Sequence, residues 1–553
     1  MVEKIFNYLN KESLGLHEAA YLLAFFTFLS QILAVLRDRV FASAFGADRL
    51  LDMYYASFRI PDFLFITVSS LVSVSVLVPL LIQNDNNIER RKTINSIFTV
   101  FLALMFIVMA LVFIFMPQLT KLVVPGLHSE TLIAMSRTLL LSPLILGVSN
   151  LIGGIIQSER RFVSYALSPV MYNLGIIFGG IVLYPILGIM GMVYGVILGS
   201  ILHVVIQIPT LVKVAIIPRI TSSIDWVSVR YIFSKSIPRT LSLAQSHIIM
   251  FVSVGIASLL ISGSITIYTL AYNLQSVPLA IIGVSYSLAA FPTLARFFKN
   301  GEKENFNKEL NSAVRHIIFW SLPVIIMFIV LRAQIVRVLF GAGNFDWSDT
   351  RLTAAALALF AISVWAQSLN LIFTRAFYAI GRTKEPFYAS LIGGIVAIIG
   401  CFSLVSILQN SKVLHDSLDS IMKVKNILGS EILALPLAFA VGSIFQSFLL
   451  MFMFKRAYCS AKLTGIWLTQ SLVASVFMGY VTYFFLNIFD DVFDLDTFFG
   501  IFTQGFLSGT FGLVSGVIVL ILMKNHEIGV VWQTLHSRIW KSKPITEDPS
   551  EVV

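Results

Sequence analysis

Apolar runs of about twenty residues recur along almost the whole chain, and they constrain the fold more than any other feature. A helix needs a run of this length to cross the hydrocarbon core of a bilayer. The runs are continuous rather than alternating, and they are too long for barrel strands. The sequence therefore predicts an all-α, multi-pass membrane protein with about fourteen spans, near residues 19–36, 62–82, 94–117, 133–157, 162–183, 187–212, 237–262, 265–293, 313–331, 352–378, 387–408, 430–453, 464–488 and 498–523.

Composition agrees with this class. Only 12% of the residues are charged, whereas soluble domains carry about 25%. The formal net charge of +10 comes from residues in short segments between apolar runs, so membrane topology explains it better than nucleic-acid binding. The two cysteines, Cys401 and Cys459, are interpreted as small hydrophobic residues rather than a disulfide or a redox site.

The basic residues lie mainly in alternate loops, as the positive-inside rule requires. They gather after even-numbered spans, whereas the loop at 489–497 is acidic (FDDVFDLD) and lies on the opposite side. This alternation predicts that both chain termini are cytoplasmic. Basic clusters that carry the signal are ERRK at 89–92, ERR at 159–161 and GRTK at 381–384.

An internal repeat divides the chain. ERRFVSYALSP (159–169) matches AIGRTKEPFYA (379–389), and VSVLVPLL (74–81) aligns with SLAAFPTL (287–294). Parallel repeats of this kind are typical of two-lobed transporters, with the candidate site at the lobe interface. We expect an N-terminal lobe at 1–220 (spans 1–6), a C-terminal lobe at 225–460 (spans 7–12), two further spans within 463–525, and a cytoplasmic tail at 526–553.

Several motif classes are missing from the sequence. There is no GxxxxGK[ST] phosphate-binding loop, and GAGNFD at 341–346 does not match GxGxxG. The eight histidines are scattered, and His247 within the seventh span is interpreted as an interior polar contact rather than a metal ligand. Gly191, Gly195 and Gly199 form a small-xxx-small series that predicts close helix packing.

The stretch VLRDRVFASAFGADRLLD (35–52) carries six charges at the predicted outer edge of the first span, where topology does not favour arginine. Arg37, Asp52 and Arg59 would converge there from adjacent elements and line a polar cavity. Arginine suits such a cavity because its planar fork donates two parallel hydrogen bonds to a phosphate or carboxylate. The alternative is that an arginine at the end of a span only extends its charged group into the water and lines no cavity. For Arg239 and Arg375, this interpretation and a role in a polar cavity stay equally open.

QILAVLRDRVFASAFGADRLLDMYYASFRIPDF (31–63) resembles the first two spans of the MurJ/MviN lipid II flippases, in the superfamily that also holds the polysaccharide flippases and the MATE exporters. VVPGL (123–127), RRFVSYALSP (160–169), VLFGAGNFDWSDT (338–350) and TRAFYAIGRTKEP (374–386) follow in the family's order and spacing. The resemblance extends over the whole chain and includes spans thirteen and fourteen, which twelve-span exporters lack.

The resemblance implies a function. Family members move the undecaprenyl-diphosphate-linked peptidoglycan precursor from the inner to the outer leaflet of the bacterial cytoplasmic membrane, and this is transport rather than enzymatic catalysis. By position, Arg37 and Asp38 match the family's Arg-Asp pair, Asp52 matches its aspartate, and Arg59 its basic residue before proline. Arg37 and Arg59 are expected to bind the diphosphate, with Asp52 orienting one of them.

The chain also departs from the family pattern. Gln31 and Phe65 stand where the family usually has arginine, Ser69-Ser70-Leu71 replaces Ala-Glu-Gly, and Tyr272-Asn273 replaces Asp-Arg. We expect Gln31, Ser70 and Asn273 to contact the uncharged part of the headgroup, in a cavity less cationic than is usual. Two alternatives stay open: a flippase or exporter for another polysaccharide-lipid or amphiphile, and a non-transporting scaffold with a degraded cavity.

The energy source and the partners are less constrained. No cofactor is expected, and the seventh span (237–262) contains no Asp or Glu to bind a coupling cation. Transport would depend on an ion gradient or on the membrane potential. The resemblance implies a tail-accommodating groove at spans thirteen and fourteen, and cell-wall synthesis proteins as possible partners.

Overall fold

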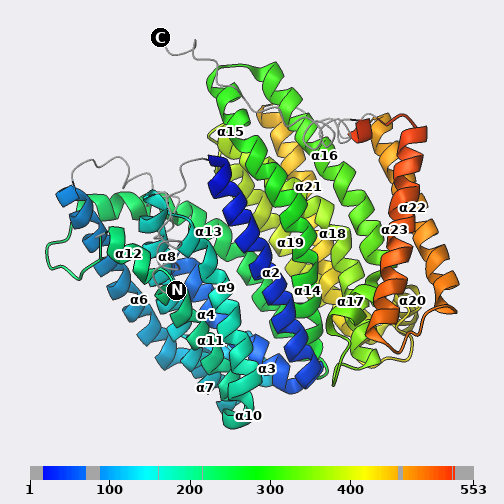
Figure 1. Ribbon diagram of the computed structural model, residues 1–553, viewed down its shortest axis with the longest axis horizontal. Coiled ribbons are helices and arrows are strands. Elements are labelled where there is room, and N and C mark those ends of the chain that lie inside the picture. Colours follow the sequence, from blue (N-terminus) through cyan, green and yellow to red (C-terminus); the bar gives the residue numbers. More distant parts are fainter. Residues whose placement is uncertain are drawn as a thin grey trace, which may run out of the picture. The chain divides into compact units, whose positions relative to one another are not determined.

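The computed structural model describes residues 16–69, 87–159, 161–214, 216–458, 465–525 and 527–529. All regular elements within these ranges are helical, and no strand occurs among them (Figure 1). Helices of the N-terminal half are α2 (Leu16–Phe45), α3 (Arg49–Ser57), α4 (Arg59–Leu64), α6 (Asn87–Val123), α7 (Glu130–Leu139), α8 (Leu141–Ser158), α9 (Val163–Phe178), α10 (Tyr184–Leu187), α11 (Ile189–Val205), α12 (Ile208–Val214) and α13 (Trp226–Ala257).

The C-terminal half continues in the same manner. Its helices are α14 (Ser264–Leu279), α15 (Ser285–Lys299), α16 (Lys303–Val330), α17 (Arg332–Phe340), α18 (Trp347–Ala379), α19 (Lys384–Asn410), α20 (Lys412–Met422), α21 (Ala434–Ala457), α22 (Ile466–Asp490) and α23 (Phe498–Leu522). Within the described residues, three π-helical segments interrupt the helices: η1 (Phe65–Ser69), η4 (Gly179–Leu183) and η5 (Ala280–Val284). Two short 3-10 turns, η3 (Pro125–Leu127) and η6 (Ser430–Leu433), complete the described elements.

Eleven helices in the described residues are long and apolar enough to cross a membrane. They correspond to eleven of the fourteen predicted spans. The other three, near 19–36, 62–82 and 237–262, fall on α2, on the α4–η1 segment and on α13. Residues 70–86, which hold most of the second predicted span, lie outside the described residues. The all-helical membrane class is confirmed, while the count of fourteen and the orientation of the termini stay predictions.

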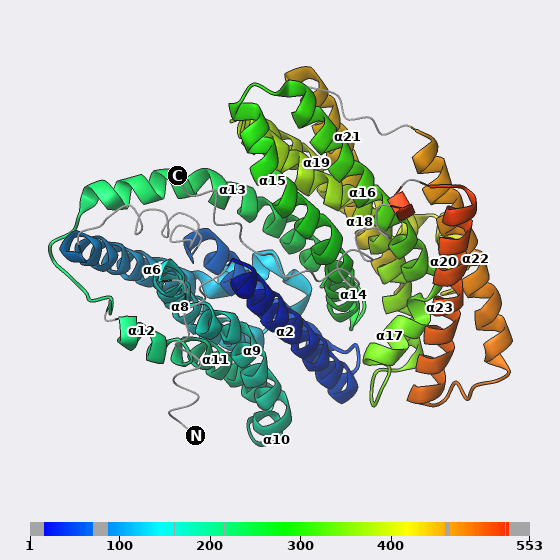
Figure 2. The same cartoon turned by 45° about the horizontal axis from the view of Figure 1, so that its top comes forward.

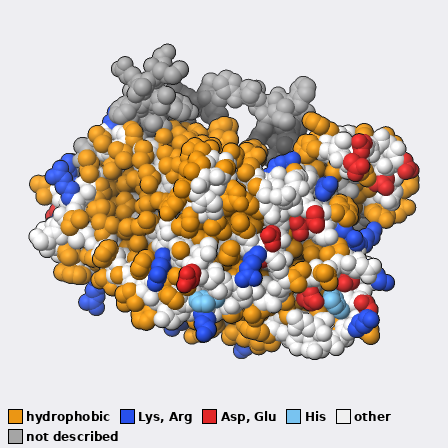
Figure 3. All heavy atoms as spheres, turned by 90° about the horizontal axis from the view of Figure 1, so that it is seen from below, with side chains coloured by type: hydrophobic (Ala, Val, Ile, Leu, Met, Phe, Trp, Pro, Cys, Tyr) orange, Lys and Arg blue, Asp and Glu red, His pale blue; other side chains and the backbone are white. Residues whose placement is uncertain are grey.

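Burial separates helices that face lipid from helices that form a core. In α6, only 17% of the apolar 18-residue stretch that could cross the membrane is buried inside the protein. In α18, the buried share of the corresponding stretch is 78%. Exposed Phe106 and Ile114 of α6 would be unfavourable in water but suit the hydrocarbon of a bilayer. Figure 3 shows a broad area of hydrophobic side chains, with charged side chains gathered in separate patches.

The chain forms two compact units, each with its own core. The first unit comprises residues 1–273, 339–359 and 390–442, and the second comprises 274–338, 360–389 and 443–553. Core residues of the first unit include Ile94, Phe101, Met105, Ile155 and Ile156. Those of the second include Phe306, Leu310, Phe373, Phe377 and Phe454. Helix α14 begins in the first unit and continues without interruption into the second. The predicted lobes, 1–220 and 225–460, stay a prediction.

The glycine series in α11 has the expected role. Helices α9 and α11 run side by side in both views (Figures 1 and 2). A Cβ placed on Gly195 would lie 2.4 Å from the Cα of Gly179, and one on Gly199 would lie 2.4 Å from the carbonyl oxygen of Tyr172. No real side chain tolerates such distances, so the close packing predicted from the sequence is confirmed.

Loops predicted to share one side of the membrane also meet in the first unit. Arg90 and Glu159, from two segments expected in the cytoplasm, form an ion pair of 2.5 Å at one end of α6. At the other end of α6, the amide of Gly126, in a loop expected on the outer side, donates to the hydroxyl of Ser258 (3.1 Å), near the outer end of the seventh predicted span. The alternation of loops is thus consistent with the fold.

Candidate functional site

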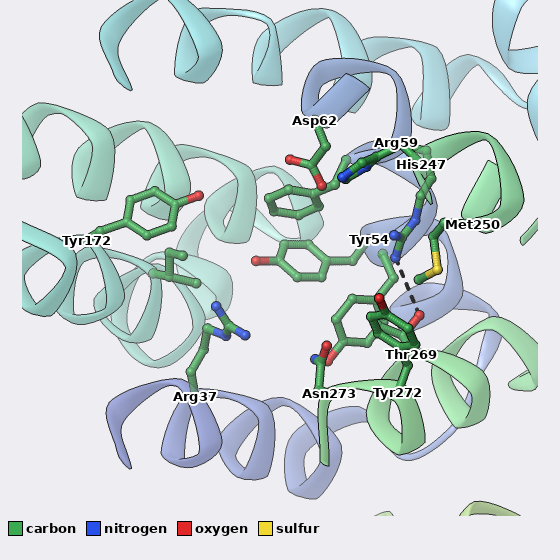
Figure 4. A pocket seen from close by; sticks show the side chains of 13 residues that line it. Arg37, Tyr54, Arg59, Asp62, Tyr172, His247, Met250, Thr269, Tyr272 and Asn273 are labelled. Atoms are coloured by element: carbon green, nitrogen blue, oxygen red, sulfur yellow. Dashed lines mark hydrogen bonds between the residues drawn. The ribbon is translucent and has the colours of Figure 1, made fainter. Parts of the chain in front are cut away.

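A polar cavity of ≈290 Å³ lies inside the first unit (Figure 4). Six segments supply its lining: α2, α3, the α3–α4 junction with α4, α9, α13 and α14. The lining residues are Arg37, Tyr54, Tyr55, Phe58, Arg59, Asp62, Tyr172, Ile176, His247, Met250, Thr269, Tyr272 and Asn273. Because these helices belong to or adjoin membrane spans, the cavity places charged and hydroxyl groups at membrane depth, where they mark functional sites by default.

A helix break brings Arg59 and Asp62 to the cavity. Pro61 has no N–H to donate to the carbonyl of Ser57, and its ring would clash with that carbonyl in a continuous helix. Helix α3 accordingly ends at Ser57, and α4 begins anew at Arg59 after Phe58. Arg59 and Asp62 are three residues apart and therefore share one face of α4. The break at Pro61 thus separates two short helices.

Arg37 is held firmly in place. Its Nε and Nη2 atoms donate to Oδ1 of Asp38 at 2.9 and 2.8 Å, and Nη1 donates to Oδ1 of Asn173 at 3.3 Å. The other carboxylate oxygen of Asp38 accepts from the amide of Asn273 at 3.0 Å. Asp38 is almost fully buried, and an unpaired charge there would be strongly unfavourable. The Asp38 carboxylate and the Arg37 guanidinium therefore stabilise each other. The Arg37 guanidinium is thereby fixed in orientation at the cavity wall.

Arg59 is less completely paired. Its Nη2 donates to the hydroxyl of Thr269 at a long 3.4 Å, the contact drawn in Figure 4. Its Nε is buried and has no hydrogen-bond partner within the described part of the chain, and the same is true of the hydroxyl of Tyr55. Buried donors are normally satisfied, so two such donors in one cavity indicate the place of a ligand.

The lining is rich in tyrosine and nearly balanced in charge. Tyr54 and Tyr172 direct their hydroxyls into the space in which the side chain of Arg37 ends (Figure 4). Asp62 lies on the same side of the cavity as Arg59 and opposite Arg37 (Figure 4), while Asp38 pairs with Arg37. The cavity therefore offers a ligand more hydroxyl groups and aromatic faces than charged groups.

Asp52 has partners other than those predicted. It is buried, and its carboxylate accepts from the amide of Gly263 (2.8 Å) and from the amide and hydroxyl of Thr266 (both 2.7 Å). It thus caps the N-terminus of α14 from another segment of the chain, where helices leave unsatisfied N–H groups. The expected role of orienting Arg37 belongs instead to Asp38.

Two glycines let the neighbouring loops meet at this end. Gly46 follows α2 with φ +68°, and Gly343 has φ +58°. A Cβ on Gly343 would lie 2.3 Å from the carbonyl oxygen of Ser43. The close approach allows the Asn344 amide to donate to Ser43 (2.9 Å) and the Ala47 amide to donate to the carboxylate of Asp349 (2.9 Å).

The structure brings together Arg37, Asp38, Arg59 and Asn273 among the predicted site residues. Gln31 is exposed and is not part of the lining, and Ser70 lies outside the described residues. Sequence reasoning missed Tyr54, Tyr55, Asp62 and Tyr172 as cavity residues, and it missed Asn173 as a partner of Arg37. The signal was present in DMYYASFRIPD (52–62), and in the single asparagine within the apolar run SPVMYNLGIIF (168–178).

Possible metal and redox sites gain no support from the described residues. They contain no group of three or more His, Cys, Asp or Glu side chains that could hold a metal ion. Cys401 is buried and free, whereas Cys459 lies outside the described residues. His247 lines the cavity as a polar wall residue.

A family model described as lipid II flippase MurJ matches residues 41–503 of this chain. A "Probable lipid II flippase MurJ" of Rickettsia prowazekii (strain Madrid E) is 28% identical over 395 residues, which cover 69% of this chain and 76% of the relative. A "Lipid II flippase MurJ" of Burkholderia cenocepacia is 25% identical over 387 residues, covering 68% of this chain and 75% of the relative.

Solved structures share the fold. A structure described as "Lipid II flippase MurJ, inward closed conformation" superposes with a TM-score of 0.71 at 23% identity, covering 93% of this chain and 99% of that chain. An inward-facing MATE family transporter of the MOP superfamily gives a TM-score of 0.60 at 14% identity, covering 77% and 94% of the two chains. At sequence identities this low, the two matches show a shared architecture and nothing more.

Proposed function

Because the chain belongs to the lipid II flippase MurJ family, we propose that it moves a lipid-linked peptidoglycan precursor across the bacterial cytoplasmic membrane. The family is one of transporters, and movement of an intact lipid needs no bond to be made or broken. The polar cavity would receive the headgroup while the lipid chain stays among apolar side chains. As the protein changes conformation, the cavity would open first to one face of the membrane and then to the other.

Arg37 and Arg59 would bind the diphosphate of the substrate. A guanidinium donates two parallel hydrogen bonds to phosphate oxygens, and such charge-assisted bonds are roughly twice as strong as neutral ones. Arg37 is oriented by Asp38 and keeps its far side toward the cavity. Tyr54, Tyr172 and Asn273 would contact the sugar and peptide portion through hydroxyl and amide groups.

The observation that carries this proposal is the pair of unsatisfied donors. The Nε of Arg59 and the hydroxyl of Tyr55 are buried, line or adjoin one cavity, and have no hydrogen-bond partner among the described residues. Leaving a donor buried without a partner costs about 1–3 kcal/mol. An anionic, oxygen-rich ligand would satisfy both donors at once.

The remaining expectations follow from the family and from the charge pattern. We expect both termini in the cytoplasm, six-span lobes that rock against each other, and transport driven by an ion gradient or the membrane potential. No carboxylate occurs in the seventh predicted span, so the coupling ion would bind elsewhere or the potential alone would act. Cell-wall synthesis enzymes that use the same lipid are expected partners.

Complementation tests the proposal. A bacterial host depleted of its own flippase should resume growth when it expresses this chain. Arg37→Ala and Arg59→Ala should each abolish rescue, since losing charge-assisted hydrogen bonds of about 1.5–3 kcal/mol weakens binding about 10- to 100-fold. Purified protein in vesicles should show the same loss in an assay of lipid II translocation.

Arg230→Ala is a matched control, because Arg230 is exposed on α13 and is not part of the cavity lining. It should rescue like the unaltered chain, and membrane levels of all variants should agree. Rescue that persists in both cavity variants would refute the assignment of Arg37 and Arg59. Failure of the unaltered chain to translocate lipid II in vesicles would refute the function itself.

A further inference from the structure

Helix α20 belongs to the first unit and comes directly after the membrane-spanning helix α19. Only Ser411 separates the end of α19 from the start of α20. Helix α19 has 27 residues and is therefore about 40 Å long, which exceeds the roughly 30 Å of a bilayer's hydrocarbon core. It begins after the basic cluster GRTK (381–384), which is expected in the cytoplasm, so α20 is expected at the outer surface of the membrane.

The side chains of α20 form four rows along the helix, because residues four positions apart lie next to each other on its surface. In order around the helix, the rows are Lys412–Asp416–Ser420, Val413–Ser417–Ile421, Leu414–Leu418–Met422 and His415–Asp419. The first and last rows are polar and adjoin each other, whereas the two rows between them are largely apolar. We call these two middle rows the apolar face of α20.

The row that faces the protein is a polar one. The Nε2 atom of His415 lies 2.7 Å from the hydroxyl of Ser430 and 3.7 Å from a carboxylate oxygen of Asp419. Asp419 is the one buried residue of this helix. A helix on the surface of a soluble domain directs its apolar stripe to the core, so α20 has a different orientation.

Much of the apolar face is turned away from the protein instead. Val413 is 75% exposed, Leu414 53% and Ile421 70%. Leu428, which follows in the connection to α21, is 84% exposed. Contiguous exposed side chains of this size mark an interaction surface.

Contacts at the end of α20 fix this orientation. Nε of Arg351, in α18, donates to the carbonyl of Lys423 at 3.0 Å. Lys423 has a left-handed φ of +60°, and the amide of the next residue, Val424, donates back to the carbonyl of Asp419 at 2.9 Å. The Val424 side chain is fully buried. The apolar face cannot rotate onto the protein without breaking these contacts.

We propose that the apolar face of α20 inserts into the outer leaflet of the membrane, so that the helix lies along the boundary between hydrocarbon and water. Lipid is favoured over a protein partner because a single residue joins α20 to a helix that already contacts lipid. Ile399 and Phe402 of α19 are 61% and 59% exposed, and such side chains on a spanning helix face hydrocarbon. The apolar face extends this lipid-contacting surface to the level of the headgroups.

Lysines near both ends of α20 suit the same partner. Lys412 precedes the apolar face and Lys425 follows it, and both are exposed. Helices that lie in a membrane interface carry such residues because ammonium groups attract lipid phosphates. The exposed polar row that starts at Lys412 faces the water. Helix α20 therefore presents one side to water, one to lipid and one to the protein.

Spin labels test the proposal in the full-length protein, with Cys401 and Cys459 replaced by serine. Leu414→Cys, Ile421→Cys and Asp416→Cys each carry one label, in nanodiscs of phosphatidylglycerol and phosphatidylethanolamine. Oxygen concentrates in hydrocarbon, whereas a nickel chelate stays in water. The ratio of oxygen to nickel accessibility should be at least fivefold higher at positions 414 and 421 than at 416. Equal ratios at the three positions would overturn the proposal, because the apolar face would then lie in water.

Added charge should expel the apolar face from lipid. Val413→Lys together with Leu414→Lys should lower the ratio for a label at position 421 at least threefold. The matched control, Asp416→Lys together with Ser420→Lys, places two lysines on the water-facing row and should change the ratio less than 1.5-fold. Circular dichroism and gel filtration establish that both variants fold. An equal fall in both variants would contradict the proposal, since the position of the charge would then not matter.

A protein partner is the competing occupant of this face. A benzoylphenylalanine photocrosslinker at position 421 in growing cells should form no adduct with a second polypeptide. A protein adduct at position 421 that is missing at position 416 would assign the face to a protein and overturn the proposal. Neither measurement depends on lipid II transport, so failure here would leave the proposed function untouched.

Discussion

The cavity of the first unit and an apolar groove in the second unit differ in what their walls offer. The groove has a volume of ≈460 Å³ and is lined by Val277, Pro278, Ile281, Ile282, Tyr286, Trp320, Val324 and Phe328. In the cavity, Arg37 makes three hydrogen bonds to Asp38 and Asn173, so direction and charge decide what fits. In the groove, Pro278, Ile282 and Val324 offer apolar surface without direction. Hydrogen bonds demand atoms at defined places, whereas hydrophobic burial follows area and volume. Substitutions in the cavity should therefore have effects when they remove a single hydrogen-bonding atom. Substitutions in the groove should have effects only when they change side-chain volume substantially.

The largest effect is expected where a buried charge loses its partner. Asp38→Ala leaves the Arg37 guanidinium without its carboxylate and should lower the free energy of unfolding by about 3–5 kcal/mol. Thermal unfolding of the purified protein measures the loss. The double change Arg37→Leu with Asp38→Leu should recover much of it, because neither charge is then left unpaired. A loss below about 1 kcal/mol would mean that the cavity does not depend on directed charge pairing.

A smaller effect is expected from a single hydroxyl. Tyr54→Phe keeps the ring and its packing but removes one donor from the cavity, and the net value of one hydrogen bond is about 1 kcal/mol. Affinity for lipid II in a nanodisc titration should therefore fall about fivefold. Tyr480→Phe, at an exposed position of α22, is the control and should leave affinity unchanged. An unaltered affinity in Tyr54→Phe would remove that hydroxyl from headgroup recognition.

The smallest effect is expected in the groove when chemistry is preserved. Val324→Leu adds one methylene to a hollow of ≈460 Å³, so it should change lipid II translocation less than twofold. The measurement is the same vesicle assay, with protein level as the control. A tenfold loss from this change would show that the groove is fitted as closely as the cavity and would end the contrast between them.

Sequence reasoning reached the helical class, the family and part of the site. Arg37, Asp38 and Arg59 were accessible because charges at a membrane edge stand out against an apolar chain. Asn173 was not, since a single asparagine in a span gives no indication of the face it occupies. The π-helical turn at Ala280–Val284 was also beyond reach, because hydrophobic pattern does not distinguish it from an α-helix.

Some expectations failed for reasons of long-range geometry. Asp52 was expected beside an arginine, but it contacts Gly263 and Thr266, which are more than two hundred positions away in the chain. Partners that tertiary folding selects cannot be read from local sequence, whereas membrane spans, set by length and hydropathy alone, can.

The cap that Asp52 places on α14 has a consequence for hydration. Three hydrogen bonds converge on one buried carboxylate, and separating these elements would expose a naked anion and two N–H groups together. Only water can replace those partners at comparable cost. Separating Asp52 from α14 would therefore require water to enter this end of the first unit.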